Sequence, residues 1–449
     1  MQIVIVGGGQ VGTTLAGKLS SEGHDVSVIE REAARVADLA DSLDVRVVAG
    51  NGATADALRR AGAADASLVV AATESDEANF VCGRVAASMF KVPHVVVRLR
   101  EPDHEEAFRE LSRSDAVDIV CVNPEAAAVE EIASLLEVPG ALDVSSFMGG
   151  ELIVAGFPIH EGSEFAERPV LDMRLFFAET PSLVAAIHRG DGALVPDGKE
   201  TIRTGDIVYF ALARSDLDGM LDLLGLSQES SRKVMVAGAG RMGLALARRL
   251  ENQIDSLVIL EPDEDRARRA SEQLAHAIVV HGPVTSERLL DEEQIERVGT
   301  FVALTDDHET NLVAGLLAKR MGAGRAFALV DNPALANLIG ETTIDAIISP
   351  RLLAIGLTLQ HIPGAVVHQM AALLGDRVEV LEAEVAKGAP VCGDAIAGLD
   401  LPRGLLFVAI GRDGELKVPR GTDRVEPGDR LLVVAASEHR ARLSELLTP

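Results

Sequence analysis

The stretch MQIVIVGGGQVGTTLAGKLS, residues 1–20, decides the fold of this chain, because a similar stretch, RKVMVAGAGRMGLALARRLE, follows at residues 232–251. Each copy places a short β-branched run before a Gly-x-Gly-x-x-Gly loop and a helix-like pattern after it. A strand, a glycine turn and a helix in this order are typical of a dinucleotide-binding Rossmann unit. The repeat therefore predicts two Rossmann units in tandem.

The match between the copies extends well beyond the glycines. At one constant offset along the chain, the matched positions are Gly7, Gly9, Val11, Gly12, Leu15, Leu19 and Glu30 with Gly238, Gly240, Met242, Gly243, Leu246, Leu250 and Glu261. After a slip by a single position, the offset is again constant and matches Gly50, Thr73, Glu77 and Asn79 with Gly282, Thr305, Glu309 and Asn311. The apolar positions spaced by four share one helix face, which we expect to lie against the sheet.

Short β-branched runs alternate with helix-like segments in each copy, as in IVIV, VSVI, VRVV, LVVAA and HVVV of the first. This alternation predicts an α/β protein with two doubly wound parallel sheets. A segment of short strand-like runs and turn signals follows each copy, and Gly205-Asp206 matches Gly428-Asp429. We therefore predict a small α+β domain after each Rossmann domain. The predicted domains are residues 1–138, 139–228, 229–362 and 363–449, with boundaries near Pro139-Gly140, Gln228–Arg232 and Pro363-Gly364.

The composition narrows the functional classes. A formal net charge of −27 over 449 residues opposes binding to nucleic acid or to an anionic lipid surface. Cys82, Cys121 and Cys392 are far apart and form no CxxC pair, which favours core residues in a reducing compartment over a disulfide frame or a zinc site. No secretory signal and no stretch of roughly 18 apolar residues is present. We expect a soluble protein that reaches a membrane only by docking on another chain.

The chemistry of the two loops favours an adenine nucleotide or dinucleotide. The first glycine permits a tight turn, the second lets the backbone approach a pyrophosphate, and the third permits close helix–strand packing. The helix N-terminus then offers N–H groups to phosphates. Glu30 and Glu261 follow the first glycine of their copies at the same spacing, at the end of the second expected strand, where a carboxylate binds ribose hydroxyls and repels a 2′-phosphate. NAD(H) is therefore favoured over NADP, although Arg31 could tolerate a phosphate, and both glutamates could instead be solvated strand ends.

Other polar positions leave alternatives open. Backbone groups of Gly50-Asn51-Gly52 could read an adenine edge, whereas Pro283 removes one N–H donor from the second copy. Thr73 and Asp76 fit a helix capping box, and Asp306 or Asp307 could cap the matching helix. The alternative is that these strand ends form a pocket floor.

Two further pairs of polar residues also allow more than one interpretation. Asn79 and Asn311 could line the pocket or lie on a helix surface. Arg98 and Arg100, which alternate in VVVRLRE, could be surface charge, or could make a phosphate or inter-subunit contact in the first copy only.

We expect no catalytic residue and no metal ligand. The predicted nucleotide-binding residues are Gly7, Gly8, Gly9, Gln10, Val11, Gly12, Glu30, Arg31, Asn51, Gly52, Thr73, Glu74, Asn79, Arg98, Arg100, Gly238, Ala239, Gly240, Arg241, Met242, Gly243, Glu261, Gly282, Pro283, Thr305, Asp306 and Asn311.

Several motifs resemble those of the TrkA family, the peripheral nucleotide-binding subunits of Trk-type potassium uptake systems. They are VIVGGGQVG, SDEAN, NPEAA and PGAL in the first copy, and GAGRMG, TDDHETN, LAKRMGA and DAIISP in the second. The resemblance spans essentially the whole chain, and TDDHETNLVAGLLAKRMGA is more specific than the glycine motif. It implies two regulator-of-potassium-conductance (RCK) units, each with a Rossmann (KTN) domain and a small C-terminal domain.

The resemblance also implies partners and ligands. It implies a cytosolic ring, most simply a tetramer with eight Rossmann units, at the inner face of the cell membrane beneath a channel subunit of the TrkH or TrkG type. The helix expected over Pro124–Val138 suits packing or exchange between subunits. NAD(H), ATP or ADP would bind the Rossmann domains and change potassium flux.

The second copy departs from the family pattern at two places. HGPVTS replaces a GDAT-like turn, which weakens adenine reading there. Arg241 replaces Gln10 of the first copy, and related ring proteins with arginine at this place use it on a terminal phosphate. The second site would then prefer ATP, unless Arg241 only pairs with a surface carboxylate.

Two other classes compete with a regulatory subunit. An NAD-dependent oxidoreductase needs an acid–base group facing the nicotinamide. His160 and His188 of the first small domain have no counterparts in the second, and no catalytic constellation is evident. A scaffold that has lost ligand binding is opposed by the intact glycines and Glu30, more firmly in the first copy than in the second.

Overall fold

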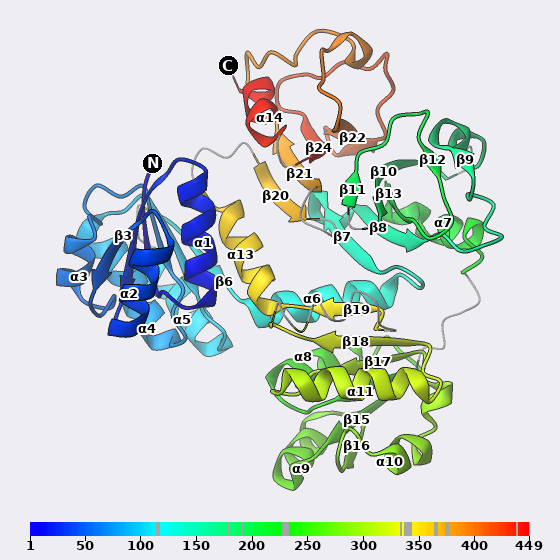
Figure 1. Ribbon diagram of the computed structural model, residues 1–449, viewed down its shortest axis with the longest axis horizontal. Coiled ribbons are helices and arrows are strands. Elements are labelled where there is room, and N and C mark those ends of the chain that lie inside the picture. Colours follow the sequence, from blue (N-terminus) through cyan, green and yellow to red (C-terminus); the bar gives the residue numbers. More distant parts are fainter. Residues whose placement is uncertain are drawn as a thin grey trace. The chain divides into compact units, whose positions relative to one another are not determined.

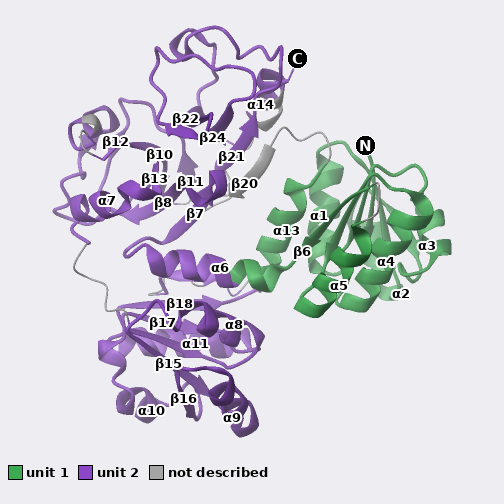
Figure 2. Ribbon diagram, turned by 180° about the vertical axis from the view of Figure 1, so that it is seen from behind, with its two compact units in different colours: residues 1–128, 349–365 green, residues 129–348, 366–449 purple. Residues whose placement is uncertain are grey.

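The computed structural model describes residues 1–113, 117–177, 180–190, 192–226, 233–332, 335, 344–362, 367–372, 378–436 and 439–448. The chain divides into two compact units, Met1–Ala128 with Ser349–Ala365, and Val129–Ile348 with Val366–Pro449 (Figure 2). The boundaries predicted at Gln228–Arg232 and at Pro363-Gly364 fall outside the described residues.

Unit 1 is built on a six-stranded parallel sheet with the order β3-β2-β1-β4-β5-β6 (Figure 1). Its strands are β1 (Gln2–Val6), β2 (Asp25–Glu30), β3 (Arg46–Ala49), β4 (Leu68–Ala71), β5 (His94–Arg98) and β6 (Asp118–Val122). Its helices include α1 (Gln10–Ser21), α2 (Ala33–Ser42), α3 (Ala55–Arg60), α4 (Asp76–Val85), which continues as a π-helical turn over Ala86–Phe90, and α5 (Pro102–Ser112). The predicted α/β class and the doubly wound parallel sheet are confirmed.

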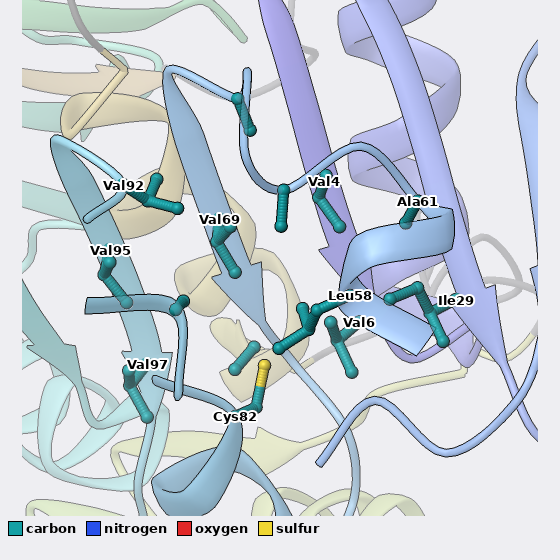
Figure 3. Packing of buried hydrophobic residues seen from close by; sticks show 14 of the residues in the cluster. Val4, Val6, Ile29, Leu58, Ala61, Val69, Cys82, Val92, Val95 and Val97 are labelled. Atoms are coloured by element: carbon teal, nitrogen blue, oxygen red, sulfur yellow. The ribbon is translucent and has the colours of Figure 1, made fainter. Parts of the chain in front are cut away.

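The core of unit 1 is formed by small and β-branched side chains between the sheet and its helices (Figure 3). Val4 and Val6 of β1 and Val69 of β4 pack with Leu58 of α3. The Cys82 thiol lies within this cluster and has no exposed surface, and burial raises its pKa to about 12. Cys82 is therefore an inert core residue, as the sequence predicted.

Unit 2 repeats this architecture in its own parallel sheet, with the order β16-β15-β14-β17-β18-β19. The strands are β14 (Lys233–Ala237), β15 (Ser256–Glu261), β16 (Ile278–His281), β17 (Thr300–Ala303), β18 (Arg325–Leu329) and β19 (Ala346–Ile348). The helices include α8 (Arg241–Leu250), α9 (Glu264–Gln273), α10 (Glu287–Glu292) and α11 (His308–Arg320). The predicted apolar faces are largely buried, since Leu15 and Leu19 of α1 and Leu246 and Leu250 of α8 are at most 2% exposed, whereas Met242 is only partly buried.

One helix spans the boundary between the two units, and another belongs to a different unit from the sheet that precedes it. α6 (Pro124–Glu137) follows β6, and its residues from Val129 onward belong to unit 2. There Arg325 Nη1 donates hydrogen bonds to the carbonyls of Leu135 at 3.0 Å and Val138 at 3.4 Å, which stabilises the end of the helix. Conversely, α13 (Pro350–Gln360) follows β19 but packs against α1 in unit 1. The helix predicted over Pro124–Val138 is confirmed as a helix.

The two small domains of unit 2 each contain an antiparallel five-stranded sheet, with the orders β11-β10-β13-β8-β7 and β20-β21-β24-β22-β23. The first comprises β7 (Asp143–Phe147), β8 (Leu152–Pro158), β10 (Ser182–Arg189), β11 (Gly192–Leu194), β13 (Ile207–Ala213) and α7 (Leu217–Leu223), with a separate pair β9 (Arg168–Pro169) and β12 (Thr201–Ile202). The second comprises β20 (Val367–Ala372), β21 (Val378–Glu384), β22 (Leu405–Arg412), β23 (Glu415–Lys417), β24 (Arg430–Ala436) and α14 (Arg440–Leu447). Side chains of both sheets share one apolar core.

The matched Gly-Asp turns have the same construction in both small domains. Gly205 and Gly428 have φ of +89° and +87°, a left-handed conformation that glycine adopts without strain. In the second domain the guanidinium of Arg412 binds both carboxylate oxygens of Asp429, at 2.7 and 2.8 Å. Arg189 and Asp206 make the same bidentate pair in the first domain. Each turn is therefore held by a carboxylate that is only 2% exposed.

Two other carboxyl groups of unit 2, those of Glu131 and Asp143, have raised pKa values. Burial raises the pKa of Glu131, on α6, to about 8, and the nearby Asp143 carboxylate acts in the same direction. Burial also raises the pKa of Asp143 to about 6, although its carboxylate accepts a hydrogen bond from the Tyr209 hydroxyl at 3.2 Å.

Candidate nucleotide-binding sites

The first and third glycines of each loop are required by the fold itself. Gly7 follows β1 with φ of +107°, and Gly238 follows β14 with φ of +106°. A methyl group on Gly12 would lie 1.8 Å from the carbonyl oxygen of Gly7, and one on Gly243 would lie 2.0 Å from that of Gly238. The turn and the helix–strand contact therefore exclude any side chain at these positions.

The middle glycines have no such structural explanation. Gly9 and Gly240 have φ of −74° and −69°, which any residue adopts. A methyl group on Gly9 would meet Arg35 Nη1 at 3.8 Å, and one on Gly240 would meet Asp306 Oδ1 at 3.9 Å, both ordinary contacts. No side chain caps the N-terminus of α1 or α8 at these glycines. The loops thus present an open approach to a helix N-terminus, where the helix dipole favours an anion.

A carboxylate lies beside each loop at the end of the second strand. Glu30 Oε2 accepts a hydrogen bond from the Gly8 N–H at 2.7 Å, and Oε1 accepts from the N–H groups of Arg31 at 2.7 Å and Glu32 at 2.9 Å. Burial alone would raise the pKa of Glu30, but these three donors and the charge of Arg35 outweigh it and lower the pKa. The carboxylate therefore stays ionised, with capacity for one further hydrogen-bond donor such as a ribose hydroxyl.

Glu261 occupies the same position in the second copy. Its Oε2 accepts from the Ala239 N–H at 2.7 Å, and its Oε1 accepts from the Asp263 N–H at 2.9 Å. The third partner differs, because Arg266 Nη2 lies 3.2 Å from Oε1. Glu30 and Glu261 are 6% and 1% exposed, so neither is a solvated strand end.

The third strand of each sheet ends beside the second strand, where these glutamates lie. The N–H of Gly50 donates to the carbonyl of Glu30 at 2.8 Å, and that of Gly282 donates to the carbonyl of Glu261 at 2.9 Å. Gly52 also has a packing role, since a methyl group there would lie 2.0 Å from Val6 Cγ1. The side chain of Asn51 accepts from the Ala53 N–H at 3.0 Å. The reading of an adenine edge by these turns stays a prediction.

The two asparagines lie inside the protein, and the helix-surface interpretation was wrong. Asn79 and Asn311 have no exposed surface. Asn79 Oδ1 accepts from the Thr73 N–H at 2.8 Å and the Thr73 hydroxyl at 2.7 Å, while its Nδ2 donates to the carbonyls of Thr73 and Arg98. Asn311 binds Thr305 and Leu329 in the same way. Each amide fixes the loop after the fourth strand, so any effect on a ligand passes through that loop.

The predicted capping box also needs correction. Ser75, rather than Thr73, caps α4, because its hydroxyl accepts from the Ala78 N–H at 3.1 Å. Asp307 caps α11, as one of the two predicted candidates, and accepts from the Thr310 N–H at 2.6 Å.

Asp76 serves a different purpose from capping. Its carboxylate accepts from the N–H groups of Arg100 at 2.7 Å and Glu101 at 2.9 Å, and from Arg100 Nε at 3.1 Å. Burial would raise the pKa of Asp76, but these donors lower it. Arg100 also donates to the carbonyl of Glu74. Arg100 is therefore a partly buried ion-pair partner and not plain surface charge, whereas Arg98 ends β5 and is half-buried.

The residues Arg35 and Arg266 were absent from the sequence prediction. They occupy matched positions near the starts of α2 and α9, at the same offset that relates the two glycine loops, and each approaches a glycine loop or its carboxylate. That register between the copies is the signal by which they could have been found.

Among the described residues, no group of three or more His, Cys, Asp or Glu side chains could hold a metal ion. No helix in the same part of the chain is long and apolar enough to cross a bilayer.

Comparison with known proteins decides the family. The TrkA-N domain profile matches residues 3–122 and 234–350, and the TrkA-C domain profile matches residues 154–225 and 380–448. The chain belongs to the TrkA family of potassium uptake proteins. The Trk system potassium uptake protein TrkA of Halomonas elongata is 34% identical, over 100% of this chain and 98% of that protein. That of Azorhizobium caulinodans is 32% identical, over 99% and 98%.

The fold of the chain is similar to that of solved RCK-domain structures. The crystal structure of the GsuK RCK domain matches 99% of this chain and 94% of that chain, with a TM-score of 0.62 and 19% identity. The GsuK channel bound to NAD matches 99% of this chain and 78% of that chain, with a TM-score of 0.63 and 19% identity. Both matches support the tandem arrangement of Rossmann and small domains that the sequence predicts.

Proposed function

We propose that this chain is a regulatory subunit of a Trk-type potassium transporter that senses NAD(H) and adenine nucleotides through its two Rossmann domains. The observation that carries the proposal is the middle glycine of each loop. Gly9 and Gly240 are not needed by turn geometry or by packing, yet both leave the uncapped N-terminus of a helix open. A phosphate that approaches the backbone explains that shared absence of a side chain.

The buried carboxylates favour NAD(H) at the first site. Glu30 is held ionised beside the loop and would accept a ribose hydroxyl, while a 2′-phosphate would meet its negative charge. The structural likeness to a channel solved with NAD is in keeping with this ligand. In this proposal Asn51, Gly52 and Thr73 lie along the nucleotide.

The second site is proposed to prefer ATP over NAD(H). Arg241 is the exposed first residue of α8, at the helix end where phosphates would lie, and Gln10 takes its place in the first copy. A planar, permanently charged guanidinium adds a contact to a terminal phosphate that a diphosphate bridge does not need. A charge-assisted hydrogen bond of this kind contributes about 1.5–3 kcal/mol.

The functional partner is proposed to be a pore-forming membrane subunit of the TrkH or TrkG type. The chain would lie at the cytoplasmic face of the membrane as a tetramer with eight Rossmann domains. Its net charge of −27 opposes direct binding to anionic lipid or to nucleic acid, so the contact with the membrane would be made through that partner.

The competing function is an NAD-dependent oxidoreductase, and one experiment separates the two. Isothermal titration calorimetry of the full chain should detect binding of NADH, ATP and ADP, and the first site should rank NADH above ATP. Incubation of the same sample with NADH and small hydroxy- or keto-acids should leave the NADH absorbance unchanged. Steady NADH oxidation that depends on such an acid would instead establish an enzyme. Failure to bind any of the three nucleotides would refute ligand sensing.

A further inference from the structure

The two middle glycines face side chains of opposite charge. The nearest atom to a methyl group on Gly9 is Nη1 of Arg35, a cation, at 3.8 Å. The nearest atom to a methyl group on Gly240 is Oδ1 of Asp306, an anion, at 3.9 Å. Both positions lie over the start of a helix where the proposed function places a phosphate. Of these two nearest side chains, Arg35 would attract a phosphate at the first loop and Asp306 would repel one at the second.

The matched arginines are held differently in the two copies. Arg35 Nε pairs with Glu32 at 3.0 Å, and both side chains are about half exposed. Arg266 lies between two carboxylates, with Nη2 3.2 Å from Glu261 and Nη1 3.3 Å from Asp306. In the second copy, Arg266 therefore forms ion pairs with both Glu261 and Asp306.

The arrangement around Arg266 can open. The Asp306 side chain is 89% exposed and that of Arg266 is 41% exposed, so solvent screens their attraction. The Nε of Arg266 is buried and has no hydrogen-bond partner among the described residues. A phosphate at the loop would offer that guanidinium a better acceptor once Asp306 has moved away.

We propose that Asp306 is a specificity-determining residue that keeps the second Rossmann site closed to phosphates while it is paired with Arg266. This inference rests on the proposed function, since it takes the glycine loop as the phosphate position. Asp306 lowers the affinity of the second site for every nucleotide, whereas Arg241 gives that site a higher affinity for ATP than for diphosphates. The first site, which has Arg35 over its glycine, binds a diphosphate more tightly than the second.

Calorimetry with ADP on the full chain tests the inference. All variants carry Gly9→Ala, whose methyl group meets no protein atom nearer than 3.8 Å and would block the first site. Asp306→Asn in this background should bind ADP roughly fivefold more tightly at low salt, because a solvent-exposed unit charge beside the phosphate is removed. The gain should shrink at high salt, as expected for a screened charge.

Asp265→Asn is the matched control. Asp265 lies on α9 and pairs with Arg268, so its substitution changes the net charge equally without touching the loop. Its ADP affinity should equal that of the Gly9→Ala chain. A gain no larger for Asp306→Asn than for Asp265→Asn would overturn the inference.

The outcomes also separate this inference from the function on which it rests. If the unsubstituted chain binds ADP and Asp306→Asn still brings no gain at the second site, only the role of Asp306 is refuted. If neither the unsubstituted chain nor any variant binds a nucleotide, the proposed function fails and the inference falls with it.

Discussion

The sharpest prediction concerns Gly9 and Gly12, two glycines of one loop. Gly9→Ala should leave unit 1 folded, because φ of −74° suits alanine and its methyl group meets only Arg35 at 3.8 Å. Loss of backbone freedom in the unfolded chain should even stabilise it by about 0.4–1 kcal/mol. NADH affinity should nevertheless fall at least tenfold, about 1.4 kcal/mol, because the methyl group fills the approach of the pyrophosphate.

Gly12→Ala should show the opposite pattern. Its methyl group would lie 1.8 Å from the carbonyl oxygen of Gly7, so β1 and α1 must move apart. Overpacking of this kind typically costs about 1–3 kcal/mol, so the chain should melt at a lower temperature.

Thermal melts followed by circular dichroism, with and without NADH, report both effects. At the same concentration, NADH should raise the melting temperature of the parent chain more than that of Gly9→Ala. Undiminished NADH affinity in Gly9→Ala would show that no phosphate lies over this loop, and the reasoning from the open glycine would be refuted.

Three further predictions concern stability. Between the ordinary pKa of 4.5 and the raised value of about 8, the folded chain keeps a proton on Glu131 that the unfolded chain has lost, so the free energy of unfolding should fall as pH rises through this window. Glu131→Gln should flatten this pH dependence of the free energy of unfolding in urea titrations. An unchanged pH dependence would contradict the raised pKa of Glu131. Asn79→Ala and Asn311→Ala should each cost about 2–4 kcal/mol by leaving several buried loop groups unpaired, and unequal costs in calorimetric melts would contradict the equivalence of the copies. Arg412→Met should cost about 3–5 kcal/mol in urea denaturation because it leaves Asp429 buried without its partner, and Arg412→Lys should recover only part of that loss.

The sequence was sufficient for features that depend on short-range patterns. The glycine spacing and the β-branched runs predicted both parallel sheets, and the match of Gly205-Asp206 with Gly428-Asp429 helped to predict a small domain after each Rossmann domain. Glu30 and Glu261 were placed beside the loops because strand length and helix length fix the distance from the first glycine. These features follow from local geometry, and each is present at matching positions in both copies.

The sequence was insufficient where a side chain finds its partner far along the chain. Asn79 resembles a surface residue on a helix, but its amide binds the distant carbonyl of Arg98. Asp76 resembles a cap, but its carboxylate holds the backbone of Arg100, beyond the following strand. The capping assignment failed for a different reason, since the first residue of a helix is the least certain element boundary and a small shift moves the cap to Ser75.

Potassium flux through the membrane partner tests the central claim most directly. The chain should co-purify with a pore-forming Trk subunit, and the complex can be reconstituted in vesicles loaded for rubidium or potassium flux. NADH, ATP or ADP should change the flux of the parent complex, whereas the Gly9→Ala complex should need at least tenfold more NADH for the same change. Flux that is the same with and without this chain, and with and without nucleotide, would contradict a nucleotide-sensing regulatory subunit.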